Sequence, residues 1–103
     1  MNALGLSTTE LDLIRSVLRR HPAVTGAILF GSRAMGIAQP ESDIDLALEG
    51  LNDFLQAEAI ASELDELPLP YRFDVVALAT AKSAQLRAHI ERVGVRVYGK
   101  TDR

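Results

Sequence analysis

Two short apolar segments enclose a polar loop in residues 24–48, VTGAILFGSRAMGIAQPESDIDLAL. Residues 24–30 are apolar and partly β-branched, and they end at Gly31 and Ser32, which predicts a buried strand that runs into a tight turn. Residues 43–48 begin with alternating acidic and apolar side chains, the pattern of a strand with one buried face. The intervening residues 33–42 are expected to form a loop or a short helix.

Helical patterns lie on both sides of this stretch. A helix is predicted over residues 8–20, because Ser7 and Glu10 have the spacing of a capping box and apolar residues recur at helical intervals after them. A second helix is predicted from Asn52 or Asp53 to residue 66. A third is predicted from a cap at Thr80 or Ser83 to about residue 93.

The remaining segments and the composition predict one compact α/β domain over residues 1–103. Residues 73–78 and 94–98 are expected to form a third strand and a short edge strand. The chain has 103 residues, of which 48% are hydrophobic, so it can form a core but has no room for a second domain.

Charge and cysteine content exclude several classes of function. The net charge of −3 argues against broad nucleic-acid binding, which depends on many lysine and arginine contacts to phosphate. The absence of cysteine excludes a disulfide and a thiolate metal site, and it fits a reducing cytoplasm. No apolar run approaches the roughly 20 residues that cross a bilayer, and the first residues do not have the pattern of a secretory signal.

Asp43 and Asp45 are the first candidate functional residues. On a strand these two side chains project from the same face, with their Cα atoms about 6–7 Å apart, while Ile44 and Leu46 point into the core. Two such carboxylates can bind Mg²⁺, and two ions can assist both the attacking and the leaving oxygen of a displacement. For an isolated Asp-Ile-Asp, the alternative is a pair of turn-capping side chains.

Gly31 and Ser32 are candidate phosphate-binding residues. Glycine allows a triphosphate to approach the backbone, and N–H groups with a hydroxyl can hold its oxygens, although an ordinary turn has the same sequence. Arg33 has a planar guanidinium that matches phosphate. Alternatively, it pairs with Asp43, Glu41 or a backbone carbonyl.

Asp74 is an acidic residue within the apolar run of residues 73–78. A buried carboxylate in such a run needs a cation or a metal ion, and Asp74 could lie across from Asp43 and Asp45. The alternative is an aspartate at the edge of a strand, paired with Arg72 or another cation. His21, His89, Tyr71 and Tyr98 are interpreted as structural or exposed residues rather than catalytic ones, with Tyr98 a possible contact to a partner.

Together these motifs resemble the polymerase-beta-like nucleotidyltransferase superfamily, and within it the minimal nucleotidyltransferase (MNT) group. The resemblance rests on Gly31-Ser32, ten intervening residues, Asp43-Ile44-Asp45, and the later Asp74. It implies an α+β fold with a small mixed sheet flanked by helices, Mg²⁺ at Asp43, Asp45 and Asp74, and the triphosphate at Gly31 and Ser32. Many relatives have a basic residue where this chain has Met35.

The resemblance also implies an activity and a partner. The expected reaction transfers a nucleoside monophosphate, by default AMP from ATP, to a hydroxyl acceptor. The expected partner is a small helical HEPN-type protein, which the MNT protein neutralises as an antitoxin by attaching AMP to a tyrosine, in a hetero-oligomer. The alternatives are a binding module that blocks its partner sterically and a small-molecule nucleotidyltransferase with a separate substrate-binding subunit.

Overall fold

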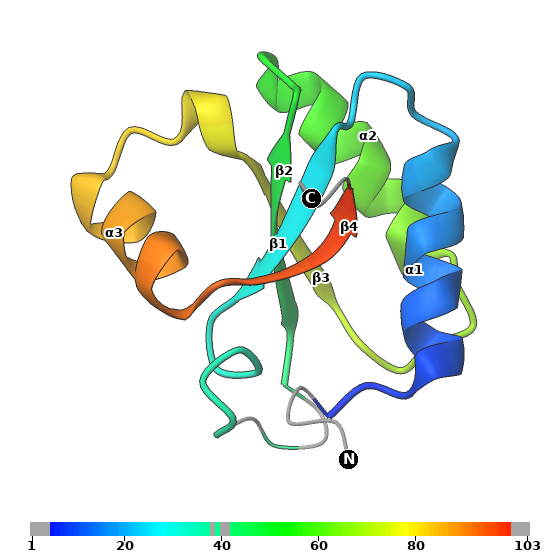
Figure 1. Ribbon diagram of the computed structural model, residues 1–103. Coiled ribbons are helices and arrows are strands. Elements are labelled where there is room, and N and C mark those ends of the chain that lie inside the picture. The colour runs from blue at the N-terminus through cyan, green and yellow to red at the C-terminus, as the bar shows by residue number, and fades with distance from the viewer. Residues whose placement is uncertain (1–4, 38, 40–41, 100–103) are drawn as a thin grey trace.

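The computed structural model describes residues 5–37, 39 and 42–99. Within them the chain forms three α-helices and a four-stranded sheet with the strand order β3-β2-β1-β4 (Figure 1). Strand β1 (Gly26–Phe30) is antiparallel to both β2 (Ile44–Glu49) and β4 (Val95–Gly99). Strand β2 is parallel to β3 (Phe73–Ala77). The expected mixed sheet with flanking helices is therefore confirmed.

The helices lie on both faces of this sheet. Helices α1 (Thr8–Arg19) and α2 (Phe54–Asp65) cover one face, and α3 (Ala84–Val93) covers the other (Figure 1). A short 3-10 helix, η1 (Leu78–Thr80), precedes α3. None of the helices in the described ranges has the length and apolar character needed to cross a membrane.

Each α-helix begins at a side-chain cap. Ser7 accepts a hydrogen bond from the N–H of Glu10, whose carboxylate accepts one from the N–H of Ser7, so the predicted capping box is present. Asp53 caps α2 through the N–H of Leu55. Of the two caps considered for the last helix, Ser83 is the one observed, through the N–H of Leu86.

Alternation along the strands divides the core between the two faces. In β2, Ile44, Leu46 and Leu48 are fully buried beneath α1 and α2. Ala47 points the opposite way and packs with Phe30 and Ile90 of α3 in a smaller cluster. The first residue of β2 on this second face is Asp45, so the smaller cluster ends where the candidate site begins.

At the other end of this second face, an ion pair crosses strand β1. Arg96 of β4 donates two hydrogen bonds to the carboxylate of Glu49 in β2, from Nη1 at 2.7 Å and from Nη2 at 3.1 Å. The pair passes over Gly26 of β1, where any side chain would collide with both groups. Gly26 therefore allows the two strands that flank β1, β2 and β4, to contact each other across it.

Candidate nucleotidyl-transfer site

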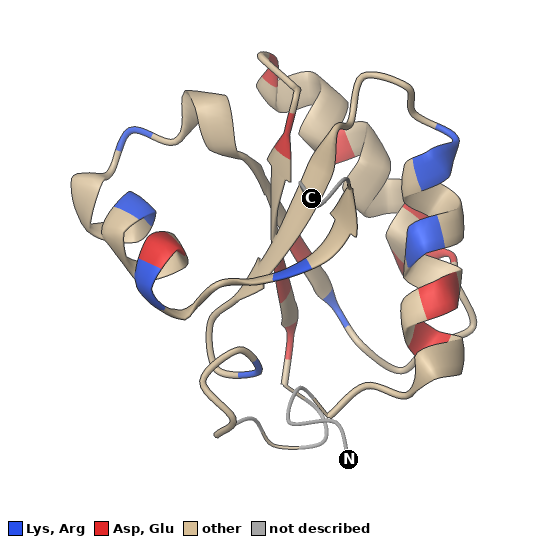
Figure 2. Cartoon of the chain, in the orientation of Figure 1, with Lys and Arg blue, Asp and Glu red and all other residues tan. Residues whose placement is uncertain are grey.

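Three aspartates lie at one end of the sheet. Asp45 is the second residue of β2, and its register partners are Phe30 in β1 and Asp74 in β3. Asp43 comes just before β2, two residues from Asp45 and therefore on the same face. Figure 2 shows acidic positions on the adjacent strands β2 and β3 near the lower end of the sheet. The structure thus places the three aspartates that the sequence singled out at the same end of the sheet.

Asp45 has the most perturbed environment of the three. It is half-buried, whereas Asp43 and Asp74 are exposed. The pKa of Asp45 is raised to about 6, mainly because burial disfavours the charged carboxylate and also because the negative charges of Asp74 and Asp43 lie nearby. A carboxylate that is repelled by two others has electrostatic reason to bind a cation.

The carboxylates do not form a ready-made metal cage. In the part of the chain that the structure describes, no group of three or more histidine, aspartate or glutamate side chains is gathered closely enough to hold a metal ion. The donor set itself fits Mg²⁺, which prefers carboxylate oxygens and keeps several water ligands. The chemistry and position of the aspartates are therefore suitable, and metal binding by them stays a prediction.

Gly31 ends β1 directly beside Asp45. Its φ is 78°, a left-handed conformation that glycine adopts without strain. A Cβ at this position would collide with the carboxylate of Asp45. Glycine is therefore needed twice at this position, for the turn and for the close approach of the carboxylate.

The chain then turns through residues 32–37. The carbonyl of Gly31 accepts a hydrogen bond from the N–H of Met35 at 3.1 Å, and that of Ser32 accepts one from the N–H of Ile37 at 3.1 Å. These bonds form a compact turn next to the aspartates. Ser32 is half-buried, while Met35 and Ile37 are exposed. Phosphate binding by Gly31 and Ser32 remains a prediction.

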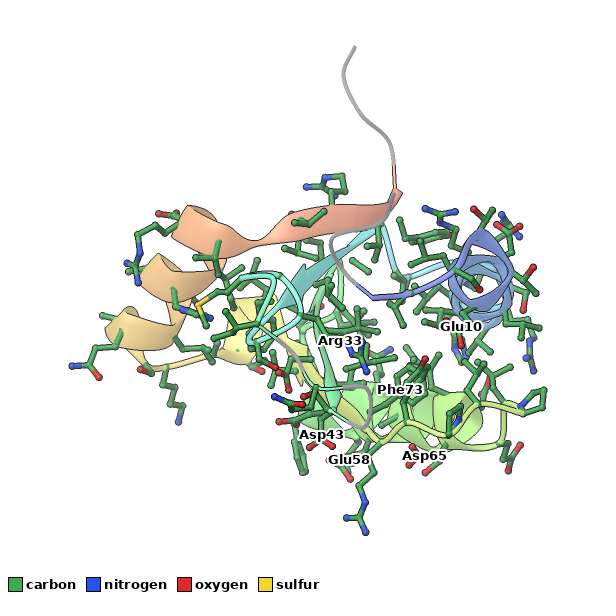
Figure 3. The ribbon with its side chains drawn as sticks, turned by 90° about the horizontal axis from the view of Figure 1, so that it is seen from below. Glu10, Arg33, Asp43, Glu58, Asp65 and Phe73 are labelled. Atoms are coloured by element: carbon green, nitrogen blue, oxygen red, sulfur yellow. The ribbon has the colours of Figure 1, made fainter. Side chains whose placement is uncertain are left out.

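Arg33 is buried, with an exposed fraction of 2%. Its Nη2 donates to the carbonyl of Ser42 at 2.9 Å, and its guanidinium lies 4.6 Å from the centre of the Tyr71 ring. Figure 3, a view onto this end of the sheet, shows Arg33 on the side of Glu10 and Phe73. Of the roles considered for Arg33, the bond to a backbone carbonyl is present. A direct contact of Arg33 with phosphate is therefore a weaker prediction than its role in holding the loop.

His89 was interpreted from the sequence as a structural or exposed residue, and the structure places its side chain beside Gly31. The residue lies in α3, and its Nε2 accepts a hydrogen bond from the N–H of Gly31 at 3.3 Å. Its ring meets Phe30 edge-on, with 6.2 Å between centroids. Because 58 residues separate His89 from Gly31, no local sequence pattern could have indicated this contact.

The other singled-out aromatic residues and His21 have structural contacts. His21 pairs with Glu63 of α2 at 3.0 Å, which links the end of α1 to α2. The hydroxyl of Tyr71 donates to Glu10 at 3.0 Å. Tyr98 packs against the larger core cluster. These three residues therefore stabilise the fold, as expected from the sequence.

Two hollows in the surface lie away from the aspartates. One, of about 830 Å³, is lined by residues that include Arg15, Thr25 and Tyr98 beside β4. The other, of about 390 Å³, is lined by residues of α3 and the Glu49–Arg96 pair. Neither is lined by a candidate carboxylate, so the chemistry of the residues rather than the depth of the surface marks the candidate site.

Comparison with known proteins finds a matching family and similar sequences and structures. A family model described as Polymerase beta, Nucleotidyltransferase matches residues 12–103. The probable protein adenylyltransferase MntA of Haemophilus influenzae is 32% identical over 99 residues, which are 94% of this chain and 86% of that protein.

Solved structures show the same fold. A crystal structure of a toxin-antitoxin with AMP-PNP has a TM-score of 0.74 and 28% identity, over 87% of this chain and 73% of that chain. The MntA-HepT toxin-antitoxin crystal structure has a TM-score of 0.70 and 25% identity, over 91% of this chain and 74% of that chain.

Proposed function

Because this chain belongs to the polymerase beta nucleotidyltransferase family, we propose that it transfers AMP from ATP to a hydroxyl group of a partner protein. The observation that carries the proposal is the position of Asp45, in register with Asp74 and directly against Gly31. Adjacent carboxylates beside a glycine turn suit the transfer of a phosphate-bearing group. The adenylyltransferase activity in the name of the Haemophilus relative supports AMP as that group.

Asp43, Asp45 and Asp74 are the residues that would hold Mg²⁺, with two ions expected. Bound magnesium would neutralise the triphosphate and make the acceptor hydroxyl more acidic. The raised pKa of Asp45 supports this assignment, because a cation between the carboxylates would relieve their mutual repulsion.

In the proposed reaction, the acceptor oxygen bonds to the alpha-phosphorus of ATP. The bond from that phosphorus to the bridging oxygen breaks, and pyrophosphate leaves with the electron pair. Asp74, which is exposed, accepts the proton of the hydroxyl. The hydroxyl and N–H of Ser32 bind the leaving phosphates, and Gly31 lets them approach the backbone. Arg33 supports the site by holding the loop to Ser42.

The proposed acceptor is a tyrosine of a small helical HEPN-type toxin, and the chain acts as its antitoxin. The two solved structures compared above are of toxin-antitoxin proteins, one of them with AMP-PNP. A hetero-oligomer follows if the toxin supplies the acceptor. The absence of cysteine is consistent with our assignment of the pair to the cytoplasm.

The proposal is tested by incubating the chain with its helical partner, Mg²⁺ and ATP labelled at the alpha-phosphate. The partner is expected to become labelled, and Asp43→Asn with Asp45→Asn should abolish the label. Asp65→Asn with Glu66→Gln is the matched control, because it removes the same charge from two exposed residues at the end of α2. Full labelling by the Asp43/Asp45 variant would refute the proposed roles of the two carboxylates.

A second candidate function is a binding module that blocks the partner sterically. It is favoured by the lack of a three-residue metal cluster among the described residues and by the exposed, uncharged Met35. Suppression of toxin activity in cells distinguishes the two functions. If the Asp43/Asp45 variant suppresses the toxin as well as the wild type does, steric binding is the function. If the variant no longer suppresses the toxin but still co-purifies with it, catalysis is the function.

A further inference from the structure

His89 connects α3 to the end of β1. Its Nε2 accepts a hydrogen bond from the N–H of Gly31, and its ring contacts Phe30, so one side chain holds two consecutive residues. We propose, on the basis of the function above, that His89 is a positioning residue: its hydrogen bond orients the Phe30–Gly31 peptide and thereby the glycine turn beside Asp45.

The direction of the hydrogen bond fixes the state of the imidazole. A backbone N–H can only donate, so Nε2 carries a lone pair and the proton of the neutral ring is on Nδ1. The edge-on contact with Phe30, at an interplanar angle of 82°, holds the ring in place for this bond. The side chain is thus ordered by one polar and one aromatic contact.

Packing alone does not explain a histidine at this position. The next residue, Ile90, is 3% exposed and is the buried residue through which α3 joins the smaller core cluster. His89 is only half-buried, and its polar atom contacts the backbone at the turn where the phosphates are proposed to bind. An apolar side chain would provide the contact with Phe30 but no acceptor for Gly31.

The orientation of this peptide matters for the proposed reaction. Gly31 lies against the carboxylate of Asp45 on one side and precedes Ser32 on the other. If the Phe30–Gly31 peptide rotates, the backbone angles of Gly31 change with it. The next peptide, which carries the N–H of Ser32, then changes direction relative to the leaving phosphates, where charge develops in the transition state. Loss of the hydrogen bond should therefore lower kcat more than it raises the KM for ATP.

The test compares two substitutions of one residue. His89→Phe keeps an aromatic ring against Phe30 and removes the acceptor; we expect kcat for partner labelling to fall about tenfold, with KM for ATP changing less than threefold. His89→Gln supplies an amide oxygen as acceptor. It should recover at least half of the decrease in log kcat that His89→Phe causes. His21→Phe, which removes the histidine paired with Glu63, is the control and should leave kcat unchanged.

NMR gives a readout that does not depend on turnover. In the nucleotide-free chain, the amide proton of Gly31 should shift upfield in His89→Phe and return toward its wild-type position in His89→Gln. A long-range nitrogen–proton spectrum should show His89 with an unprotonated Nε2. A shift unchanged in His89→Phe, or a loss of kcat that His89→Gln does not restore, overturns the positioning role. If wild-type protein labels no partner, the proposed function fails instead.

Discussion

At the scale of single residues, Gly31 and Gly36 form a matched pair. Both have left-handed backbones, with φ of 78° and 76°, but a Cβ would meet Asp45 at Gly31 and open space at Gly36. Gly36→Ala should cost about 1 kcal/mol from backbone strain alone. Gly31→Ala should cost at least about 2 kcal/mol and abolish labelling, because the carboxylate must move as well. Urea denaturation measures both, and equal losses would contradict the predicted collision.

The raised pKa of Asp45 predicts a pH-dependent stability. Because the folded pKa is about 6 against an ordinary value of 3.8, the folded state binds this proton more tightly than the unfolded state does. The contribution of Asp45 to stability therefore falls as pH rises from about 4 to 6. After allowance for solvent screening, the loss is on the order of 1 kcal/mol.

Asp45→Asn should remove this loss, so the variant should gain stability relative to wild type as pH rises through the same window. The measurement is the free energy of unfolding at pH 4 and pH 7 in EDTA. Asp65→Asn, at an exposed position of α2, is the control and should follow the wild type. A variant that loses as much stability as the wild type between the two pH values would show that Asp45 is not the responsible group.

At the scale of elements, Arg33 connects three segments that precede or follow strands. It comes after β1, binds the carbonyl of Ser42 before β2, and lies over Tyr71 before β3. Arg33→Lys should cost about 2 kcal/mol, because lysine lacks the planar group that both bonds and stacks. The exposed Arg72 provides the control, and Arg72→Lys should change stability by less than about 0.5 kcal/mol. Thermal unfolding of the two variants compares them, and equal stability would show that the buried contacts contribute little.

The elements could be predicted well from sequence because their signals are local. The predicted start of helix α1 at Thr8 is confirmed. It could be predicted because the capping serine and the capping glutamate are only three residues apart. The strand boundaries depend on pairing and were less accurate. Asp43 was assigned to the second strand, but the ladder begins at Ile44, whose N–H donates to the carbonyl of Arg72. Leu78 was assigned to the third strand, but it begins the 3-10 turn η1.

The residues of the candidate site could be predicted only where the spacing of two residues, or the order of motifs along the chain, indicates their positions. Asp43 and Asp45 share a face because side chains alternate along a strand. That Asp74 lies opposite Asp45 depends on the register of two strands joined through α2, which only the fold supplies. The contact of His89 needs α3 packed on β1, and the burial of Arg33 needs the Tyr71 ring above it. Neither arrangement has a local signature.

At the scale of the whole molecule, ligand binding should raise stability. A nucleotide that binds only the folded chain stabilises it by about 2.7 kcal/mol at 100 times its Kd. With Mg²⁺ and AMP-PNP we therefore expect Tm to rise by several degrees. The rise should be lost in EDTA and in the chain with Asp43→Asn and Asp45→Asn, as measured by calorimetry. An equal rise in EDTA would contradict a role for metal in nucleotide binding.

The strand order also determines when the sheet can be completed during synthesis. Strand β1 is an inner strand, and one of its two neighbours is β4, which is also the last strand of the described chain (Figure 1). While translation is still in progress and residues 95–99 remain inside the ribosome, one side of β1 has no partner. Until residues 95–99 emerge, the nascent chain therefore exposes an open edge of a largely apolar strand, and this period is when it would most benefit from chaperones.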